Sequence, residues 1–311
     1  MPLLEENSGK KAGRDFGVCM SPEFLRQGNA VYDTRNPDSV VIGELDRKSG
    51  DFLEAFSSDL YVGQDVPILR MNLESAELVK YGRNMFLAMN ISYVNEMARI
   101  CEMIPGIDIK EVVKGIGADW RINPTFLNAG AGYGGSCLPK DMKALIAYAR
   151  SLGYEPQLLQ SVEDVNYRQA RHMVAIAEEE LGELKGKRVA LLGLSFKPNT
   201  DDMREAPSIK IARLLEERGA NIIAYDPKAI RNAREKFICD TIRISYAGNV
   251  EECLRDADCC MLVTEWDEFE KLGPEVFNNL MKTSFVIDGR RIYDKEFQEK
   301  IQKYRGIGLG K

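Results

Sequence analysis

The chain has 311 residues, of which 44% are hydrophobic and 29% charged, and its formal net charge is −6. This composition is typical of a globular protein of about two domains. The acidic balance argues against nucleic acid as a partner, because nucleic-acid binding needs a basic face. No run of about 18 apolar residues occurs and no leader sequence is evident at the N-terminus, so we expect no membrane partner and a cytoplasmic protein.

Cysteine and histidine usage narrows the chemistry. The cysteines are scattered without a Cys-x-x-Cys pair, which argues against a disulfide framework and a zinc site. They are Cys19, Cys101, Cys137, Cys239, Cys253, Cys259 and Cys260. The last two lie in an apolar run and are expected to be buried. His172 is the only histidine, in a helical stretch flanked by arginines where we expect it to be solvated, so no metal site is predicted and acid–base chemistry must come from carboxylates, lysines or a cysteine.

Residues 1–65 contain two short strand-like pieces, 16–20 and 40–43, separated by turn-rich sequence. This is too little chain for an independent α/β core, so we predict the end of a domain whose beginning is absent. Residues 66–185 are mostly helical by the spacing of their apolar residues, and we predict a central dimerisation domain. The helices are expected at 75–103, 109–116, 141–152 and 162–184.

Residues 186–311 alternate buried strand-like runs with helical ones, which predicts a parallel, doubly wound sheet of the Rossmann type and an α/β fold class. The strands are expected at 188–194, 220–225, 259–263 and 285–287, with a helix at 208–218. No G-x-G-x-x-G follows a predicted strand. Gly193 stands at the corresponding first turn without the further glycines that let a backbone approach a pyrophosphate. This domain is therefore not predicted to be a dinucleotide binder.

The segment from Gly130 to Asp141 carries the strongest chemical signal. Its glycines predict a turn with exposed amides, and Cys137 follows them at the predicted start of a helix. The helix dipole and the nearby Lys140 would stabilise a thiolate there, as in an activated nucleophile. Asp141 lies one helical turn further on the same face. The alternative is a glycine-rich loop with an incidental thiol.

Two further constellations lie nearer the N-terminus. Lys80 and Asn84 are four residues apart on one face of the long predicted helix, where they interrupt an apolar pattern; the alternative is a solvated lysine beside a surface amide. Glu23 follows a proline at a strand end and could act as a base. It could equally be a helix-start carboxylate that meets the helix dipole.

Basic residues are predicted at the carboxyl edge of the C-terminal sheet, where open α/β sheets bind ligands. Lys197 and Arg204 follow the first strand, and Arg290 and Arg291 follow the strand at 285–287. Two basic clusters at one edge suit a nucleotide diphosphate. The alternative is ordinary surface charge.

Together these segments resemble the UDP-glucose/GDP-mannose dehydrogenase family, from about residue 3 to about residue 300. Eight ordered motifs carry the resemblance: SPEFLRQGNAVYD (21–33), PDSVVIG (37–43), ELVKYGRNMFLAMNISYVNEMARICE (77–102), GYGGSCLPKD (132–141), FKPNTDDMREAPS (196–208), AYDP (224–227), TEWDEF (264–269) and DGRRIYD (288–294). The family's fold has an N-terminal NAD-binding Rossmann domain, a central helical dimer domain and a C-terminal nucleotide-sugar-binding domain. The chain looks like a member lacking most of its first domain, with residues 1–65 as the remnant.

The resemblance implies oxidation of a sugar hydroxymethyl group to a carboxylate with two NAD. Cys137 would attack the aldehyde to give a thiohemiacetal, whose oxidation gives a thioester. Lys80 would stabilise the oxyanion and Asn84 would help to hold it. Asp141 would assist a water or accept a proton, and Glu23 would act as a base in thioester hydrolysis.

Other site residues follow from the same resemblance. The substrate-binding positions would be Phe24, Leu25, Arg121, Phe126, Asn128, Tyr133, Gly134, Phe196, Lys197 and Arg290. The cofactor-binding positions would be Lys140, Arg204 and Gln27. The last departs from the family, which usually has glutamate there, so the carboxylate charge is lost while the hydrogen bonds are kept.

Residues 129–135 resemble the UDP-glucose branch of the family, and Ser136 before the cysteine argues against the N-acetylmannosamine branch. The resemblance thus implies oxidation of UDP-glucose to UDP-glucuronate, in polysaccharide biosynthesis, by a homodimer that uses NAD and needs a missing or separate NAD-binding polypeptide. The alternative is a non-catalytic, dimeric UDP-sugar-binding remnant or regulator.

Overall fold

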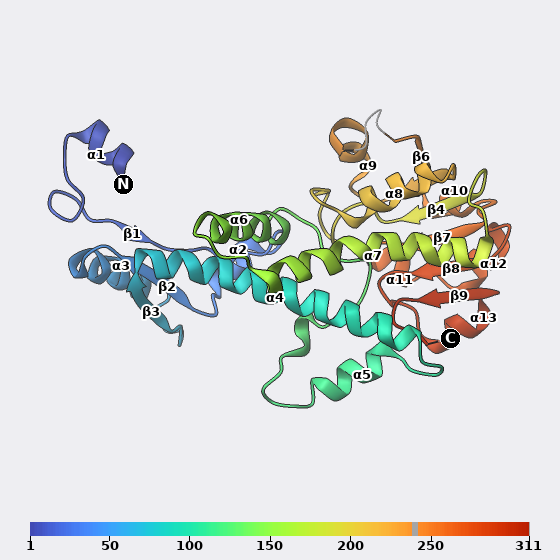
Figure 1. Cartoon of the computed structure of the whole chain (residues 1–311), viewed down its shortest axis with the longest axis horizontal. Coiled ribbons are helices and arrows are strands. Elements are labelled where there is room, and N and C mark those ends of the chain that lie inside the picture. The colour runs from blue at the N-terminus through green and yellow to red at the C-terminus, as the bar shows by residue number, and fades with distance from the viewer. Residues whose placement is uncertain (238–241, 311) are drawn as a thin grey trace. The chain divides into compact units, whose positions relative to one another are not determined.

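The computed structural model of the chain describes residues 1–237 and 242–310, so Cys239 lies outside the described residues. The chain divides into two compact units, Met1–Asn84 and Met85–Lys311 (Figure 1). The division falls within the helix α4, Leu73–Glu102. Among the described residues, no helix is long and apolar enough to cross a bilayer.

The first unit is built on a three-stranded sheet in the order β1-β2-β3, with β1 antiparallel and β3 parallel to the central strand. Its elements before α4 are α1 (Pro2–Ser8), β1 (Cys19–Met20), α2 (Ala30–Arg35), β2 (Val40–Glu44), α3 (Arg47–Leu60) and β3 (Ile68–Asn72). Its core is small and includes Val41 and Ile42 from β2 and Ala76 from α4. Both predicted strands are confirmed, the first in shorter form and the second one residue longer than predicted, whereas β3 was missed because a single short strand pairs only through the tertiary fold.

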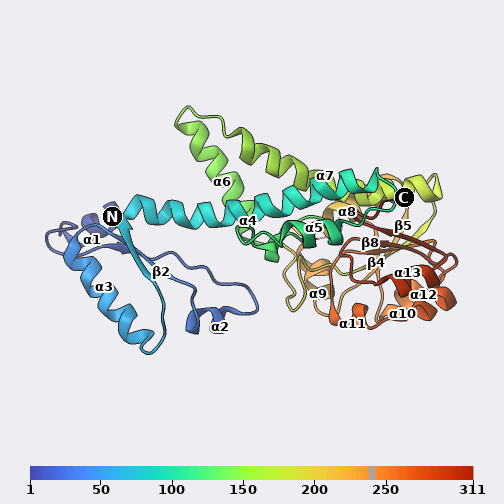
Figure 2. The ribbon, with the colours of Figure 1, turned by 90° about the horizontal axis from the view of Figure 1, so that it is seen from below.

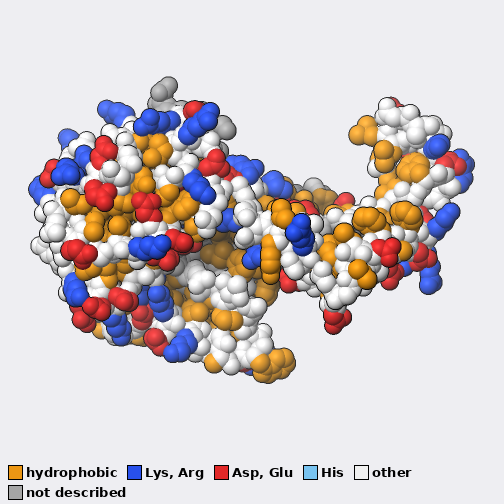
Figure 3. All heavy atoms as spheres, turned by 180° about the vertical axis from the view of Figure 1, so that it is seen from behind, with side chains coloured by type: hydrophobic (Ala, Val, Ile, Leu, Met, Phe, Trp, Pro, Cys, Tyr) orange, Lys and Arg blue, Asp and Glu red, His pale blue; other side chains and the backbone are white. Residues whose placement is uncertain are grey.

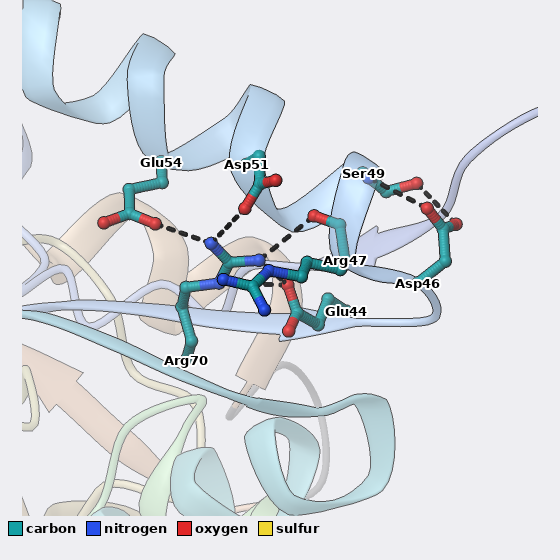
Figure 4. A network of polar contacts seen from close by, with 7 residues as sticks. All are labelled: Glu44, Asp46, Arg47, Ser49, Asp51, Glu54 and Arg70. Atoms are coloured by element: carbon teal, nitrogen blue, oxygen red, sulfur yellow. Dashed lines mark hydrogen bonds and ion pairs between the residues drawn. The ribbon is translucent and has the colours of Figure 1, made fainter.

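Arg70 ties α3 to the sheet of this unit (Figure 4). From β3 its guanidinium donates to Glu44 on β2 and, at 2.5 and 2.7 Å, to Asp51 and Glu54 on α3. The three carboxylates raise the pKa of Arg70. Four charged side chains from three elements thus fix the helix against the strands, although each ion pair near the surface adds little free energy alone.

The helical segment of the second unit comprises the rest of α4, then α5 (Ile109–Ile116), the 3₁₀ turn η1 (Pro124–Phe126), α6 (Leu138–Ser151) and α7 (Gln157–Leu181). The last two form an antiparallel hairpin (Figure 2). Met142 and Ile146 of α6 pack with Val162 of α7 and Met85 of α4. All four predicted helices are confirmed, but α6 begins three residues and α7 five residues earlier than the predicted ranges.

The C-terminal part carries six parallel strands in the order β6-β5-β4-β7-β8-β9. They are β4 (Arg188–Leu192), β5 (Asn221–Tyr225), β6 (Ile244–Tyr246), β7 (Cys259–Leu262), β8 (Phe285–Asp288) and β9 (Lys303–Gly306). Counted from β4, this is the 3-2-1-4-5-6 order of a Rossmann sheet. The predicted doubly wound sheet is confirmed, and the two edge strands β6 and β9 were missed.

Helices cover both faces of this sheet. On one face α7 and α8 (Pro207–Glu217) pack over Val189 and Leu191 of β4. On the other, the alternate residues Ala190 and Leu192 meet the second helical layer. That layer consists of α10 (Val250–Leu254), α12 (Pro274–Leu280) and α13 (Lys295–Lys300), and the remaining short helices are α9 (Ile230–Asn232), η2 (Ala233–Phe237) and α11 (Asp267–Glu270).

The structure tests two side-chain predictions of the sequence. Cys259 and Cys260 are fully buried in β7, as predicted. The prediction of a solvated His172 is wrong: its side chain is 11% exposed and its Nε2 lies 2.7 Å from Oε2 of Glu102 on α4. The flanking arginines suggested an exposed position, but His172 lies on the side of α7 that meets Glu102 of α4.

Candidate active site

Cys137 is the N-cap residue of α6, directly after the glycine-rich segment. It is the one exposed cysteine among those that the structure describes. Its Sγ lies 3.6 Å from the hydroxyl of Ser136, and Pro139 follows in the first turn of the helix, where its missing N–H costs nothing. The predicted placement of an accessible thiol at a helix N-terminus is therefore confirmed.

Asp141 lies in the first turn of the same helix and is buried, with its N–H donating to the carbonyl of Cys137 at 2.9 Å. The ammonium of Lys140 donates to Oδ1 of Asp141 at 2.6 Å while remaining mostly exposed. The structure thus brings the predicted thiol, carboxylate and lysine together within one helical turn. The lysine charge is directed at the carboxylate.

The loop before Cys137 packs against the segment that follows β4. The N–H of Gly135 donates to the carbonyl of Arg204 at 2.8 Å. Gly135 has φ +87°, and the ring of Phe196 lies 2.8 Å from where its Cβ would stand, so only glycine fits. Gly134 likewise approaches the backbone of Glu205. Two motifs 60 residues apart in sequence therefore form one continuous surface.

Basic and aromatic groups on that surface match the predicted substrate edge. Lys197 lies over the ring of Phe196, with 5.6 Å from its Nζ to the ring centroid. Arg204 is exposed, and its Nη2 lies 2.6 Å from Oδ2 of the buried Asp202. This contact raises the pKa of Arg204, to which the nearby Cys137 also contributes.

The adjacent arginines after β8 diverge. Arg290 donates to the carbonyl of Val263 at 2.7 Å and, more weakly, to that of Gly132 at 3.4 Å. Arg291 instead turns inward, is 4% exposed, and pairs with Asp108. The prediction that both arginines supply charge to the sheet edge is therefore wrong for Arg291, which is used inside the fold.

The first turn of the C-terminal sheet already contains an anion. Both carboxylate oxygens of Asp226, at the end of β5, are buried; one accepts the N–H groups of Leu194 and Ser195 at 2.7 and 3.0 Å. The same oxygen accepts the indole N–H of Trp266 at 3.1 Å. These backbone N–H groups are the ones that a dinucleotide pyrophosphate would need. The residues at this turn do not fit a dinucleotide, in agreement with the missing glycines.

The first unit gathers a separate set of predicted residues. Nζ of Lys80 on α4 lies 2.9 Å from Oε1 of Glu23 and 5.5 Å from the ring centroid of Phe24. The other carboxylate oxygen accepts the N–H of Leu25 at 2.7 Å. The alternative that Glu23 starts a helix is wrong, because residues 21–26 are not helical.

One residue that the sequence did not indicate joins this cluster. The guanidinium of Arg83 lies 3.9 Å from the centroid of the Phe24 ring and donates to Ser39 at 2.7 Å. Its position three residues after Lys80 was the available signal, since both then share a helix face. Asn84 follows on the same helix and Gln27 lies in an exposed turn.

The remaining predicted substrate positions lie in the segment between α5 and α6. Arg121 is exposed and bonded to Asp119, Phe126 is half-buried in η1, and Asn128 donates to the carbonyl of Thr125 at 3.1 Å. Tyr133 is 7% exposed and packs among the central helices, where burial raises its pKa. Within the described residues, no three histidine, cysteine or carboxylate side chains are grouped as metal ligands.

Three sequence models of one family match this chain in succession. The UDP-glucose/GDP-mannose dehydrogenase NAD binding domain matches residues 1–61, the central domain 74–168, and the UDP binding domain 190–295. The first match confirms NAD as the predicted cofactor. It does not support the prediction that the N-terminal domain is largely missing.

Curated relatives and solved structures agree with these matches. The chain is 44% identical over 292 residues to UDP-glucose 6-dehydrogenase AglM of Haloferax volcanii, covering 94% of this chain and 66% of the relative. It is 39% identical to UDP-glucose 6-dehydrogenase of Rickettsia typhi, covering 96% and 68%. A UDP-glucose dehydrogenase structure from Pyrobaculum islandicum is 38% identical with a TM-score of 0.85, covering 96% and 65%. The chain thus spans about two thirds of the length of the relatives it matches.

Proposed function

The chain belongs to the UDP-glucose/GDP-mannose dehydrogenase family, and on that premise we propose that it acts in the NAD-dependent oxidation of UDP-glucose to UDP-glucuronate. The observation that carries the proposal is the exposed thiol of Cys137 at the N-terminus of α6. The loop before it is bonded to Arg204 and Arg290 of the domain that matches the UDP binding model.

Cys137 is the proposed nucleophile. Its sulfur forms a bond to the C6 aldehyde carbon and gives a thiohemiacetal. This covalent adduct holds the carbon in a fixed geometry from which a hydride can leave. NAD, when bound, supplies the hydride acceptor for each of the two oxidations. Water then breaks the resulting thioester, and the thiolate leaves. Asp141 assists that water or accepts its proton.

The first unit contributes the remaining proposed roles. Lys80 supplies a cation for the oxyanion, Asn84 helps to hold that oxyanion, and Glu23 acts as a base in thioester hydrolysis. The 2.9 Å contact between Nζ of Lys80 and Oε1 of Glu23 supports a joint role, because it keeps the two side chains together. Lys140, Arg204 and Gln27 are the proposed contacts to NAD. A pyrophosphate-binding turn would come from a separate NAD-binding polypeptide.

The nucleotide sugar is assigned to the edge formed by the loop and the C-terminal sheet. Lys197, Phe196 and Arg290 would hold its diphosphate and base, since guanidinium and ammonium groups recognise phosphate oxygens. The segment with Arg121, Phe126 and Asn128 and the loop residues Tyr133 and Gly134 are proposed to complete this site. On the face seen in Figure 3, lysine and arginine side chains are interspersed with acidic ones.

A homodimer is part of the proposal. Phe86, Tyr93 and Ile100 recur every seven residues on α4, and all three are exposed. Residues at this spacing share one helix face. A second copy of the chain packed there would bury this apolar stripe.

The experiment titrates the purified chain with UDP-glucose, with GDP-mannose as the control, and then follows NADH formation with UDP-glucose and NAD. Saturable binding of UDP-glucose alone, with NADH formed by the chain or after addition of an NAD-binding polypeptide, supports the proposal. Binding without NADH under either condition supports instead a non-catalytic UDP-sugar-binding protein. Absence of binding to UDP-glucose contradicts the proposal.

A further inference from the structure

Three buried amide side chains form hydrogen bonds with the backbone of the loop that leads to Cys137. Asn95 comes from α4, and Asn166 and Gln169 come from α7. They are 0%, 8% and 2% exposed. Burying an amide side chain costs folding free energy unless its hydrogen bonds are made. The hydrogen-bond partners of these three amides therefore indicate their role.

Two of the amides hold the first residue of the loop, Gly130, through its backbone N–H and its carbonyl. Oδ1 of Asn95 accepts the N–H of Gly130 at 2.8 Å, and Nε2 of Gln169 donates to the carbonyl of Gly130, also at 2.8 Å. The third amide, Asn166, makes both bonds to one residue: it accepts the N–H of Tyr133 at 2.8 Å and donates to its carbonyl at 3.1 Å.

The fit beneath the loop is tight. Gly132 lies between Gly130 and Tyr133 and has φ +98°. Oδ1 of Asn166 lies 2.7 Å from where a Cβ of residue 132 would stand. A side chain at position 132 would therefore displace the amide. From the opposite side, the C-terminal domain holds Ala131 through the carbonyl of Gly289 at 2.9 Å.

The buried position of Asn95 carries a cost in folding free energy. Its Nδ2 is buried without a hydrogen-bond partner, and an unsatisfied buried donor costs free energy. Asn95 uses its acceptor on the loop and leaves its donor unpaired. Its position is therefore explained more simply by the loop conformation that it enforces than by a contribution to stability.

Resting on the proposed function, we propose that Asn95, Asn166 and Gln169 are positioning residues, which set the loop 130–135 and thereby the place of the Cys137 thiol. Four hydrogen bonds fix the loop at Gly130 and Tyr133, and only three residues separate Tyr133 from Cys137. Displacement of a reacting atom by about 1 Å can reduce a rate by about a hundredfold, so a small loosening of this loop is sufficient to be detected.

The test measures the rate at which iodoacetamide alkylates Cys137 in the full chain, quantified on the Cys137 peptide by mass spectrometry, beside the melting temperature. Asn166→Ala removes both bonds to Tyr133, and we expect alkylation to slow at least about fivefold as the thiol leaves the helix N-terminus. Asn166→Asp retains the acceptor and loses the donor, so its rate should lie between those of the alanine variant and the unsubstituted chain.

Ser92→Ala is the matched control. Ser92 lies on α4 one turn before Asn95 and is buried, and its hydroxyl donates to the carbonyl of Val162 on α7 at 2.7 Å. It links the same two helices without a hydrogen bond to the loop. Its loss should lower the melting temperature and leave the alkylation rate unchanged.

Alkylation of Asn166→Ala at the unsubstituted rate, with a melting temperature lowered as in the control, would overturn the proposal. If that variant does not fold, Gln169→Leu, which removes one bond at similar volume, gives the same comparison. Protection of Cys137 by UDP-glucose, measured in parallel, tests the proposed function separately: its absence in the unsubstituted chain would contradict that function, while the ligand-free rates still decide the role of the amides.

Discussion

Arg291 and Asp108 form an ion pair inside the second unit, with 2.7 Å between Nη2 of Arg291 and Oδ2 of Asp108. The arginine follows β8, where it adopts φ +57°, and the aspartate is the N-cap of α5. The same guanidinium donates to the carbonyl of Ile307 at 3.0 Å. The pair therefore joins the C-terminal sheet to the corner between α4 and α5.

Asp108→Asn is expected to lower the free energy of unfolding by about 3 kcal/mol, because it leaves a buried guanidinium without its counter-ion. Urea denaturation of the full chain measures the change. The control is Glu111→Gln, which removes an exposed carboxylate from the first turn of the same helix and should change stability by less than about 0.5 kcal/mol. Equal effects of the two substitutions would show that the pair contributes nothing of its own.

The same pair predicts an acid-sensitive stability. Burial alone would raise the pKa of Asp108, but the hydrogen bonds from Arg291 and Lys110 outweigh it and lower the pKa below its ordinary 3.8. The stabilisation is then fully present above about pH 4 and is lost as the pH falls through the lowered value. Unfolding measured from pH 6 to pH 3 should show a smaller loss for Asp108→Asn than for the unsubstituted chain; parallel curves would contradict the prediction.

Asp226 is expected to be essential for the C-terminal sheet. Both carboxylate oxygens of Asp226 accept backbone N–H groups, one from Leu194 and Ser195 and the other from Lys228 and Ala229. Whichever way its amide turns, Asp226→Asn therefore puts an N–H₂ donor against backbone N–H groups. We expect a loss of about 3 kcal/mol or more in the free energy of unfolding, since several buried donors lose a charged acceptor. Asp201→Asn, at an exposed position on the turn after β4, should be neutral. An Asp226→Asn variant as stable as this control would show that the buried carboxylate is dispensable.

The described cysteines should react in a fixed order. Cys137 is exposed, whereas burial raises the pKa of Cys253 to about 12 and raises that of Cys259 and Cys260 as well. At pH 8 these buried thiols hold almost no thiolate, the form that reacts. Iodoacetamide should therefore label Cys137 in the native chain, and Cys253, Cys259 and Cys260 only after unfolding. Early labelling of Cys259 would mean that β7 opens in the native state.

Arg290→Met is expected to weaken UDP-glucose binding at least tenfold, because it removes a guanidinium that lies at the sheet edge beside the loop, Val263 and Glu265 and guanidinium groups recognise phosphate oxygens. Calorimetric titration measures this. Arg231→Met, which removes an exposed arginine paired only with Glu235 among the contacts described here, should bind as the unsubstituted chain does. If both variants bind equally well, Arg290 has no role in recognition.

Local signals in the sequence were sufficient for much of the fold. The apolar spacing predicted α4 almost to its ends and α5 at both ends, because a helix is a local structure whose face repeats every three or four residues. Four buried strands were predicted from continuous apolar runs. The edge strands β6 and β9 were not, because short, partly exposed strands are defined by the neighbour they pair with.

The candidate site shows the same division. The sequence by itself determined the glycine loop, the cysteine, the helix that follows and the basic residues after two strands, because each depends on residue types at short spacing. Only the tertiary structure decided that Arg291 turns inward to Asp108, that Asp226 occupies the first turn of the sheet, and that three distant amides hold the loop. Those outcomes depend on which buried polar groups can find partners, and partners from other elements meet only when the chain has folded.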